Sequence, residues 1–345
     1  MSHEASEDAP HAPAISLIIT VFKASPFFED CLKSVSRQTF RDFEVILVDD
    51  YPEQDLGHFV ADYSGRIPGL RCVKNDRNEG TMVSRIIGVE AARGDYVAFL
   101  DYDDTCKDRC LDVLYAAALE SGADVVGSLV NNRKRRDPVF IEGTDTLLEG
   151  FLDETIDNWN VWTRLFSRDV LAALSKYKPF LREHRITAPE DFAINLLCAL
   201  HGYSYYQINE VLISHRFDIA ESETNNASVE SLTAKMASYA NIIRLLQGAE
   251  PRHREALDAL FLMSVGYTYE TSLMHAHPDV FREVVDRTLT IENGSEVVTA
   301  VLVSSDKRNR RLSEKQAAKR RRVTLLRKLT GLHYLSAAKQ RLREG

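Results

Sequence analysis

Three carboxylates follow an apolar segment in the sequence VAFLDYDD, which spans Val97–Asp104. They belong to Asp101, Asp103 and Asp104, and acidic side chains are rarely buried without a partner. If the apolar segment is a strand, its alternation points Asp101 and Asp103 to the same side. Two oxygen ligands that face one way suit Mg²⁺ or Mn²⁺, which bind through one or two carboxylates and substrate phosphates. The spacing therefore suggests a metal-assisted site for a nucleotide diphosphate, although an Asp-rich turn is the simpler interpretation.

Strands and helices alternate around these acids at intervals of roughly 25 residues, a pattern typical of a mainly parallel sheet with helices on both faces. The predicted strands are nearly continuous apolar runs, as expected for strands buried on both faces. The strands are Ile15–Val21, Phe43–Val48, Leu70–Lys74, Tyr96–Leu100, Asp124–Gly127 and Val211–Ser214. The helices are 27–35, Leu56–Tyr63, Thr81–Arg93, 111–118, Thr144–Leu152, Arg168–Leu174 and Phe192–Leu200.

Polar residues stand at the carboxyl ends of three of these strands. They are Thr20–Phe22, Asp49–Asp50 and Asp101–Asp103. In open parallel sheets, ligands bind beyond the carboxyl ends of the strands. The sequence therefore predicts that these three segments form one binding rim.

The composition is that of a globular protein, with 44% hydrophobic and 27% charged residues in a chain of 345. No apolar run reaches the about eighteen residues that a membrane span needs, so none is expected. Residues 1–14 are acidic and rich in Pro and Ala, which favours a disordered tail over a signal peptide. The five scattered cysteines lack zinc spacing and favour free thiols in a reducing cytoplasm.

The C-terminal third is helical by pattern, with predicted helices at Val229–Gln247, Arg254–Met274, Asp279–Leu289 and Glu296–Val303. Asp218–Ser228 is polar and strandless, and we place a domain boundary there. The predicted units are a tail at 1–14, an α/β domain at 15–220, a helical domain at 228–305 and a basic tail at 306–345.

The basic tail contrasts with an acidic body, because 306–345 holds 14 Lys and Arg against 3 Asp and Glu in a chain of net charge −8. Leucines three or four apart beside these cations predict an amphipathic helix suited to an anionic membrane surface. Docking on the acidic body is the simpler alternative. Nucleic-acid binding is not expected, because Tyr334 is the tail's only aromatic residue apart from His333.

Residues 15–216 together resemble the family 2 glycosyltransferases, inverting enzymes with a GT-A fold. The segment ISLIITVFKASPFFEDCLKSVSRQTFRDFEVILVDD is similar to the family's opening strand, helix and second strand. The segment NEGTMVSRIIGVEAARGDYVAFLDYDD is similar to its Asn-x-Gly turn, helix and acidic motif, and Glu190–Asp191 to its late acid pair. The joint order of these motifs is more specific than any one of them.

The resemblance implies a nucleotide-sugar site at the predicted rim. Thr20 and Phe22 would frame the base and ribose of the donor, and Asp49 would accept a hydrogen bond from a uracil ring. Arg85 would lie near the diphosphate. Asp101 would meet the ribose or the donor sugar.

The resemblance also implies a metal and a catalytic base. Asp103 would hold Mn²⁺ or Mg²⁺, which stabilises the negative charge that the leaving nucleoside diphosphate gains. Asp191 would be the base that activates the incoming hydroxyl, with Glu190 as its rival. His215 and Arg216 would lie near the leaving group, and Arg216 is assigned to the nucleotide-sugar site.

Three departures from the family pattern bear on donor specificity. Tyr51–Glu53 replaces a loop that is usually rich in Gly and Ser, and Ile86 replaces the usual Asn after Arg85. Tyr102, assigned to the nucleotide-sugar site, is bulkier than the small residue typical between the acids.

Structural explanations stand beside several of these assignments. Glu190 and Asp191 both favour a helix N-terminus, where the dipole stabilises acids. Arg85 could be a solvated charge and His215 a packed ring. Trp159 and Trp162 could stack on an acceptor sugar or simply fill the core.

The sequence thus predicts an enzyme that transfers a sugar from a nucleotide diphosphate sugar, expected to be a UDP-sugar, to a hydroxyl. The acceptor would be a cell-surface glycan or a lipid-linked molecule, and the enzyme would act in the cytoplasm or at the inner face of the plasma membrane. One alternative is a non-catalytic nucleotide-sugar-binding partner of the same fold. Another is a sugar nucleotidyltransferase, which would need a Gly-rich loop that VFKASPF lacks.

Overall fold

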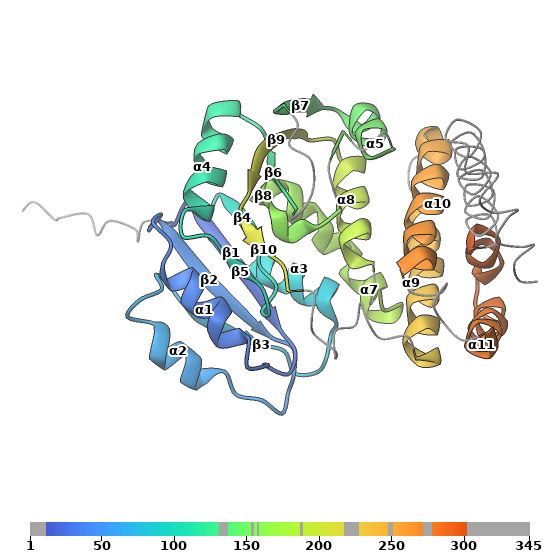
Figure 1. The fold of residues 1–345 in the computed structure, drawn as a ribbon, viewed down its shortest axis with the longest axis horizontal. Helices are drawn as coiled ribbons and strands as arrows, with labels where there is room; N and C mark the ends of the chain where they lie inside the picture. Colours follow the sequence, from blue (N-terminus) through green and yellow to red (C-terminus); the bar gives the residue numbers. More distant parts are fainter. Residues whose placement is uncertain are drawn as a thin grey trace, which may run out of the picture.

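The protein is built around one eight-stranded sheet flanked by helices (Figure 1). The structure is a computed structural model that describes residues 12–130, 137–152, 155–156, 159–186, 189–216, 228–247, 251–271 and 278–301. The basic tail 306–345, most of the predicted 1–14 tail and the polar boundary segment lie outside these ranges. The large-sheet strands are β1 (Ile15–Val21), β2 (Phe43–Asp49), β3 (Arg71–Lys74), β4 (Tyr96–Phe99), β6 (Val125–Leu129), β7 (Val139–Glu142), β8 (Arg164–Ser167) and β9 (Ser204–Val211).

The sheet is mainly parallel, as predicted, with the strand order β3-β2-β1-β4-β8-β6-β9-β7. Strands β1 to β4 pair in parallel, with Ile18 opposite both Ile46 and Phe99. The apolar runs of β1, β2 and β4 are largely buried on both faces, and every residue of β2 is buried. Strand β3, at the edge of the sheet, is partly exposed. Strands β8 and β7 run antiparallel to their neighbours. A separate two-stranded ladder joins β5 (Thr105–Cys106) to β10 (Ile213–Ser214).

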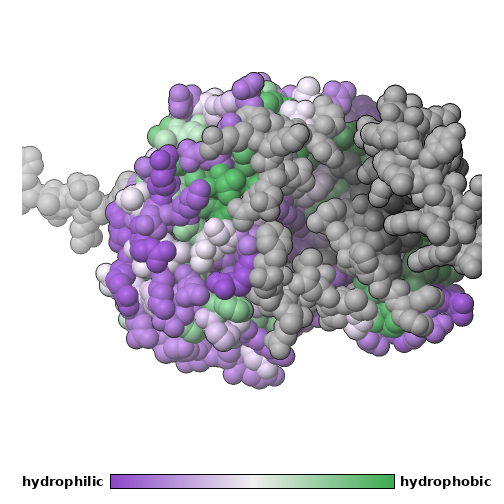
Figure 2. Space-filling view, in the orientation of Figure 1, coloured by the Kyte–Doolittle hydropathy of each residue, from purple (hydrophilic) through white to green (hydrophobic). Residues whose placement is uncertain are grey.

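Helices cover both faces of the sheet. In the first part of the chain they are α1 (Phe28–Ser36), α2 (Gly57–Tyr63), α3 (Thr81–Ala91), α4 (Cys110–Ser121), α5 (Thr144–Leu152), α6 (Arg168–Ala172), α7 (Lys178–Glu183) and α8 (Glu190–Leu200). One buried cluster packs α1 and α4 against one face, and another packs α3, α5 and α8 against the other. Figure 2 shows a mainly hydrophilic surface over α1 and α2, at the lower left of the view.

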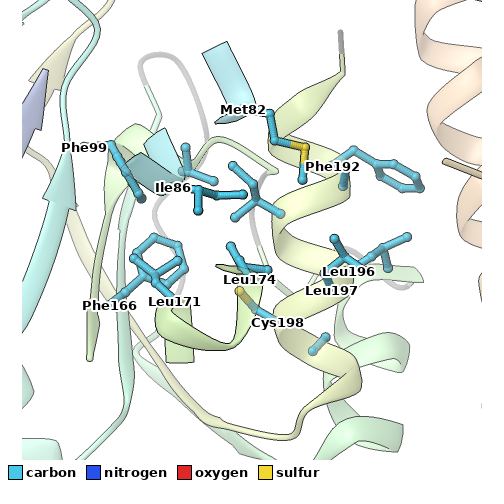
Figure 3. Packing of buried hydrophobic residues seen from close by; sticks show 14 of the residues in the cluster. Met82, Ile86, Phe99, Phe166, Leu171, Leu174, Phe192, Leu196, Leu197 and Cys198 are labelled. Atoms are coloured by element: carbon cyan, nitrogen blue, oxygen red, sulfur yellow. The ribbon is translucent and has the colours of Figure 1, made fainter. Parts of the chain in front are cut away.

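The contact between α3 and α8 fixes the part of the fold that matters for the site. Met82 and Ile86 of α3 lie close to Phe192 and Leu196 of α8 in one buried cluster (Figure 3). Gly88 lets α3 approach β1, because a Cβ atom there would lie 2.5 Å from Ile18 Cγ2. The two helices therefore keep a fixed distance from each other and from the sheet.

The C-terminal helices are α9 (Val229–Gln247), α10 (Arg254–Thr271) and α11 (Pro278–Leu289). Helix α10 packs on α5, and α11 packs on α9 on the side away from the sheet (Figure 1). They have a cluster of their own that includes Tyr239 and Phe261. Ile242 and Leu260, however, belong to the same buried cluster as α5 and α8. The predicted division at Asp218–Ser228 stays a prediction. Within the described ranges, no helix is both long enough and apolar enough to cross a membrane.

Three strands of the large sheet, β7, β8 and β9, were not expected from the sequence, and neither was the two-residue β5. Strand β9 places Ser204 and Gln207 in buried positions, so it lacks the apolar run that identifies a buried strand. Strand β8 begins with Arg164, whose side chain is fully buried between the rings of Phe151 and Tyr205. The predicted strand Val211–Ser214 is split between the end of β9 and β10.

Candidate functional site

The carboxyl ends of β1, β2 and β4 meet at one edge of the sheet. The amide of Asp50 donates to the carbonyl of Val21 at 2.9 Å, and the amide of Leu100 donates to the carbonyl of Ile18 at 3.1 Å. The residues after each strand therefore share one rim, the position where ligands bind in open α/β sheets.

Arg85 of α3 links the acids of this rim to the start of α8. Its side chain is 3% exposed, and Nη2 lies 2.9 Å from Asp101 Oδ1. Nη1 lies 2.5 Å from Asp191 Oδ1 and 3.4 Å from Glu190 Oε1. The guanidinium also lies over the ring of Phe99, with 5.6 Å between Cζ and the ring centre. One cation therefore serves three carboxylates, and it is neither solvated nor on an open helix face.

The first turn of α8 presents Glu190 and Asp191 to the rim with side chains 19% and 18% exposed. Burial and the neighbouring Asp191 raise the pKa of Glu190 to about 8, against the opposing effect of Arg85. Burial also raises the pKa of Asp191, again opposed by Arg85. Because Asp191 Oδ2 accepts a hydrogen bond from Val161 N at 3.2 Å, donors hold both of its oxygens. Asp191 is the better oriented of the two acids.

Asn195 supports this arrangement from within α8. Its side-chain nitrogen donates to the carbonyls of Trp159 and Asp191, at 2.6 and 2.7 Å. This fixes the segment that carries Val161 against the first turn of the helix. No sequence pattern predicts this role, because Asn195 stands in an otherwise ordinary apolar helix.

Asp103 has the environment of a cation ligand. It is partly buried, and burial together with Asp101 and Asp104 raises its pKa to about 6. Among the described residues, no cationic side chain forms an ion pair with the Asp103 carboxylate. The described part of the chain also contains no group of three or more His, Cys, Asp or Glu side chains that could hold a metal ion. A single oxygen donor among like charges fits Mg²⁺ or Mn²⁺, which complete their shell with water and phosphate.

Asp104 is a structural anchor and not a helix cap. It is fully buried, and both of its oxygens lie within 3.1 Å of His215 Nδ1. It also accepts a hydrogen bond from the amide of Arg216 at 2.9 Å. The hydrogen bond between Asp104 and the His215 ring raises the pKa of His215, while burial opposes the rise. His215 in turn stacks on Trp162, with 5.2 Å between ring centres.

Arg216 lies beside the acidic loop. Its guanidinium lies over the ring of Phe27 at 4.1 Å, and Nε donates to the carbonyl of Asp103 at 3.4 Å. The ring of Tyr102 is edge-on to that of Phe28, with 6.4 Å between ring centres. Arg216 therefore lies against the acidic loop and Tyr102 against α1, and their part in a nucleotide-sugar site stays a prediction.

Asp49 ends β2 with a buried carboxylate, 1% exposed. Oδ1 accepts hydrogen bonds from Gln54 Nε2 at 2.7 Å and Tyr51 N at 3.2 Å. Oδ2 has no hydrogen-bond partner within the described chain, and Lys74 Nζ lies 4.0 Å from it. On the adjoining strand, Thr20 is partly buried and Phe22 is 39% exposed.

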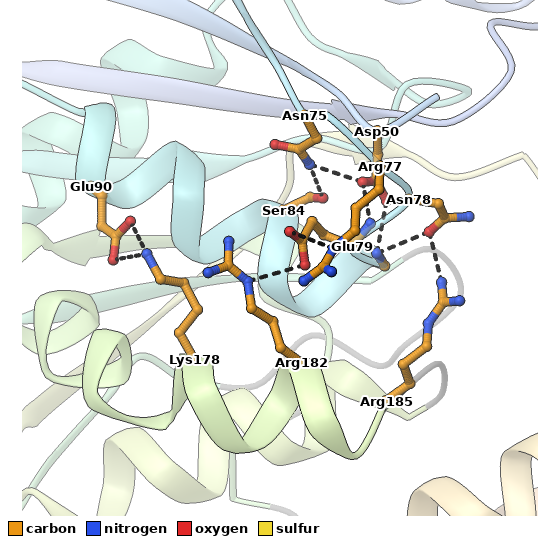
Figure 4. A network of polar contacts seen from close by, with 11 residues as sticks. Asp50, Asn75, Arg77, Asn78, Glu79, Ser84, Glu90, Lys178, Arg182 and Arg185 are labelled. Carbon is orange, nitrogen blue, oxygen red and sulfur yellow. Dashed lines mark hydrogen bonds and ion pairs between the residues drawn. The ribbon is translucent and has the colours of Figure 1, made fainter. Parts of the chain in front are cut away.

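Asp50 is a residue that the sequence analysis left without a role. It accepts hydrogen bonds from Asn75 Nδ2 and from the amides of Glu79 and Gly80, at 2.8–2.9 Å (Figure 4). Gly80 adopts a φ of +84°, which favours glycine and starts α3. Asp49 and Asp50 thus have different roles. Asp50 fixes the turn before α3, the helix that carries Arg85.

Basic side chains from α7 and from the segment just after it contact the same turn. Arg182 Nε donates to Glu79 Oε2 at 3.1 Å, and Arg185 Nη2 donates to Asn78 Oδ1 at 2.7 Å (Figure 4). Neither α7 nor these pairs were predicted. Exposed pairs of this kind contribute little stability each, but together they tie α7 to the rim.

The two tryptophans differ in burial. Trp162 is a core residue, 6% exposed, whereas Trp159 is partly buried and stacks on Phe151 with 4.2 Å between ring centres. Packing therefore accounts for Trp162, and stacking of Trp159 on an acceptor sugar stays a prediction.

Comparison with known proteins bears on the first half of the chain. Residues 16–167 match the family model described as Glycosyl transferase family 2. The matched segment is less than half of the chain, and within it the chain is similar to the family 2 glycosyltransferases. The match covers the rim acids and Arg85 but ends before α8, so the family model does not include Glu190 or Asp191.

Curated proteins similar to this chain include bacterial glycosyltransferases. The chain is 27% identical over 215 residues to the "Uncharacterized glycosyltransferase EpsJ" of Bacillus subtilis (strain 168), a match covering 59% of this chain and 61% of EpsJ. It is 25% identical to "Glycosyltransferase GlyG" of Streptococcus pneumoniae, covering 42% and 49% of the two chains. The chain thus spans about half to three fifths of the length of these relatives.

Solved structures similar to this chain share the GT-A fold. The crystal structure of S. aureus TarS 1-349 aligns with a TM-score of 0.57 at 15% identity, covering 83% of this chain and 80% of that one. The same TarS fragment in complex with UDP-GlcNAc aligns with a TM-score of 0.56 at 16% identity and covers 83% of this chain. These similarities concern the fold.

Proposed function

We propose that this protein is a metal-dependent, inverting glycosyltransferase that moves a sugar from a UDP-sugar to a hydroxyl group. The observation that carries the proposal is the Arg85 bridge, which joins Asp101 on the donor rim to Asp191. A displacement reaction needs its leaving group and its base on opposite sides of the reacting carbon and at a fixed separation. A rigid bridge between the two sites meets that need.

The donor's base and ribose would lie along the ends of β1 and β2. Oδ2 of Asp49 is a buried acceptor, and the other carboxylate oxygen, Oδ1, already accepts a hydrogen bond from Gln54. Uracil N3–H is a matching donor for Oδ2. Thr20 and the exposed ring of Phe22 flank this position. The binding of UDP-GlcNAc by TarS, which shares the fold, supports a uridine donor.

Asp103 would hold the divalent cation, with phosphate oxygens and water completing its shell. Such a cation stabilises the charge that develops on the leaving diphosphate. Arg216, whose guanidinium lies beside the Asp103 carbonyl, would contribute a second positive charge at the same place.

Asp191 would act as the base. Arg85 and Val161 N both stabilise its ionised form, whereas Glu190 holds a proton at neutral pH because its pKa is about 8. The hydroxyl of the acceptor would pass its proton to Asp191 while its oxygen attacks the anomeric carbon. The nucleoside diphosphate leaves from the opposite face, which inverts the configuration.

The acceptor is proposed to be a cell-surface glycan or a lipid-linked molecule. The basic tail 306–345 would bring the enzyme to an anionic membrane at the cytoplasmic face, close to such an acceptor. Co-sedimentation of the full chain and of a form ending at residue 305 with anionic liposomes tests this. Equal binding by the two forms would exclude a role for the tail.

The function itself is tested by thermal shift with UDP-, GDP-, dTDP- and CMP-sugars, with and without Mn²⁺. A ligand that binds the native state raises its Tm, so UDP-sugars with Mn²⁺ should give the largest rise. The preferred donor then serves a transfer assay on the wild type and Asp191→Asn. Unchanged turnover in the variant would contradict the base assignment, and donor binding without turnover would favour a non-catalytic partner.

A further inference from the structure

We infer that Gln54 is a positioning residue that sets the nucleobase preference of the donor site. The inference rests on the proposed function, since it concerns how that site selects its nucleotide. Gln54 lies in the loop between β2 and α2, directly after the Tyr51–Glu53 segment that departs from the family pattern. It touches both strand ends that would flank the base.

On the β2 side, Gln54 fixes the carboxylate of Asp49. Nε2 donates to Asp49 Oδ1 at 2.7 Å, and the amide of Tyr51 donates to the same oxygen at 3.2 Å. Lys74 Nζ donates to the carbonyl of Gln54 at 2.5 Å, which holds the loop on β3. With Oδ1 occupied, Oδ2 is the oxygen left to accept from a ligand.

On the β1 side, Gln54 supports a strained turn. Oε1 accepts a hydrogen bond from the amide of Ala24 at 3.0 Å. The preceding residue, Lys23, has a φ of +55°, a conformation that non-glycine residues rarely adopt. Its ammonium lies 5.5 Å from the ring centre of Phe22 and 5.2 Å from that of Tyr51. One amide side chain thus holds both the turn that presents Phe22 and the acid beside it.

This geometry favours a base with a ring N–H over one without. Uracil offers N3–H to Asp49 Oδ2, whereas N3 of cytosine carries no hydrogen and would face a carboxylate with a lone pair. A buried polar group left unpaired by the wrong ligand is a strong source of discrimination. The discrimination requires that Asp49 cannot rotate, and Gln54 is the side chain that prevents rotation.

Calorimetric titration of UDP and CDP, with Mn²⁺ present, tests the inference on the full chain. The variants are Gln54→Ala, which removes both contacts, and Gln54→Glu, which keeps the size but replaces the donor to Asp49 with an oxygen. Glu53→Gln is the matched control, because Glu53 is exposed in the same loop. The Tm of each unliganded variant is measured in parallel.

We expect the wild type and Glu53→Gln to prefer UDP over CDP. Both Gln54 variants should lose UDP affinity by at least about tenfold, the effect of one charge-assisted hydrogen bond, and their UDP preference should shrink. Their Tm should stay close to that of the wild type. A purely structural role would lower the Tm or weaken both nucleotides equally, and would overturn the inference.

Two further outcomes separate the inference from the function beneath it. Wild-type levels of UDP affinity and preference in both Gln54 variants would overturn the inference and leave the proposed function standing. Absence of nucleotide binding by the wild type would overturn the proposed function, and the inference with it.

Discussion

At the scale of single residues, the site depends on one buried cation. Arg85 faces Asp101, Asp191 and Glu190, so the cluster keeps an excess of negative charge in a partly desolvated place. Removing one partner from a buried ion pair costs more than the pair contributes, because the remaining charges lose their compensation. The arginine is therefore a structural requirement of the site as well as a link within it.

Substitution of Arg85 should destabilise the protein. We expect Arg85→Ala to lower the free energy of unfolding by roughly 3–5 kcal/mol, because three acids lose their shared cation. Arg85→Lys should recover part of this but not donor turnover, since a single ammonium cannot bridge Asp101 and Asp191 as a planar fork does. Denaturant unfolding measures the first effect and a transfer assay the second. Wild-type stability of Arg85→Ala would show that the bridge is not formed in solution.

The raised pKa of Glu190 predicts a pH dependence of stability. Its pKa is about 8 in the folded protein against an ordinary value of 4.5, so between these values the folded state holds a proton that the unfolded state has lost. The free energy of unfolding should therefore fall as the pH rises from about 5 to 8.

Glu190→Gln tests this, because glutamine resembles the protonated acid. Its Tm should change less between pH 6 and pH 8.5 than that of the wild type, and it should be the more stable protein at the higher pH. Parallel Tm profiles for the two proteins would contradict the assignment.

The residues that lie at the rim could be predicted from the sequence, but most of their contacts could not. Asp49, Asp101 and Asp103 follow recognisable strands, so their shared edge could be predicted. The contact of Arg85 with Asp191 could not, because it joins residues 106 positions apart through the packing of α3 on α8. The predicted contact of Arg85 with a diphosphate stays a prediction.

At the scale of elements, helix α3 is the part that holds the site together. Its N-terminal turn is fixed by Asp50, its middle carries Arg85, and its far end packs on β1 through Gly88. A displacement of this helix would move the bridge relative to the rim. The tight contact at Gly88 is therefore important although it lies away from the acids.

Gly88→Ala should destabilise the protein by about 1–3 kcal/mol, because its Cβ would lie 2.5 Å from Ile18 Cγ2 and a packed core relaxes only in part. Gly65→Ala is the control, since a Cβ there would meet no atom within 4 Å. Denaturant unfolding of the two variants gives the comparison. Equal stability of both would mean that α3 shifts without cost.

Elements with a uniform pattern could be predicted, and those with a mixed pattern could not. The apolar runs of β1, β2 and β4 gave their positions to within a residue at most ends. Strand β8 was missed because it is four residues long and carries the buried Arg164. Its place between β4 and β6 depends on long-range pairing that no local pattern contains.

At the scale of the whole molecule, the C-terminal helices share part of the buried core that α5 and α8 form against the sheet. Leu260 of α10 is fully buried in the cluster that also contains Leu147 and Phe151 of α5. A shared apolar core couples the unfolding of the parts that contribute to it. The helical pattern of this region was predictable, but the surface on which it packs was not.

We expect Leu260→Ala to cost roughly 2–5 kcal/mol and to lower the Tm of a single transition. Leu289→Ala, at a side chain that is 52% exposed, should leave the transition nearly unchanged. Differential scanning calorimetry of both variants measures this. Two separate transitions, of which only one moves in Leu260→Ala, would show that the two regions unfold independently.

The stacking of Trp162 on His215 has an optical consequence. The chain contains only two tryptophans, so Trp159→Phe would leave one indole, and that indole lies against the imidazole held by Asp104. Indole emission responds to the charge and motion of the group beside it. Fluorescence of this variant would therefore report changes at His215 and Asp104, next to Asp103. The measurement needs no added dye, no labelled nucleotide and no knowledge of the sugar and acceptor.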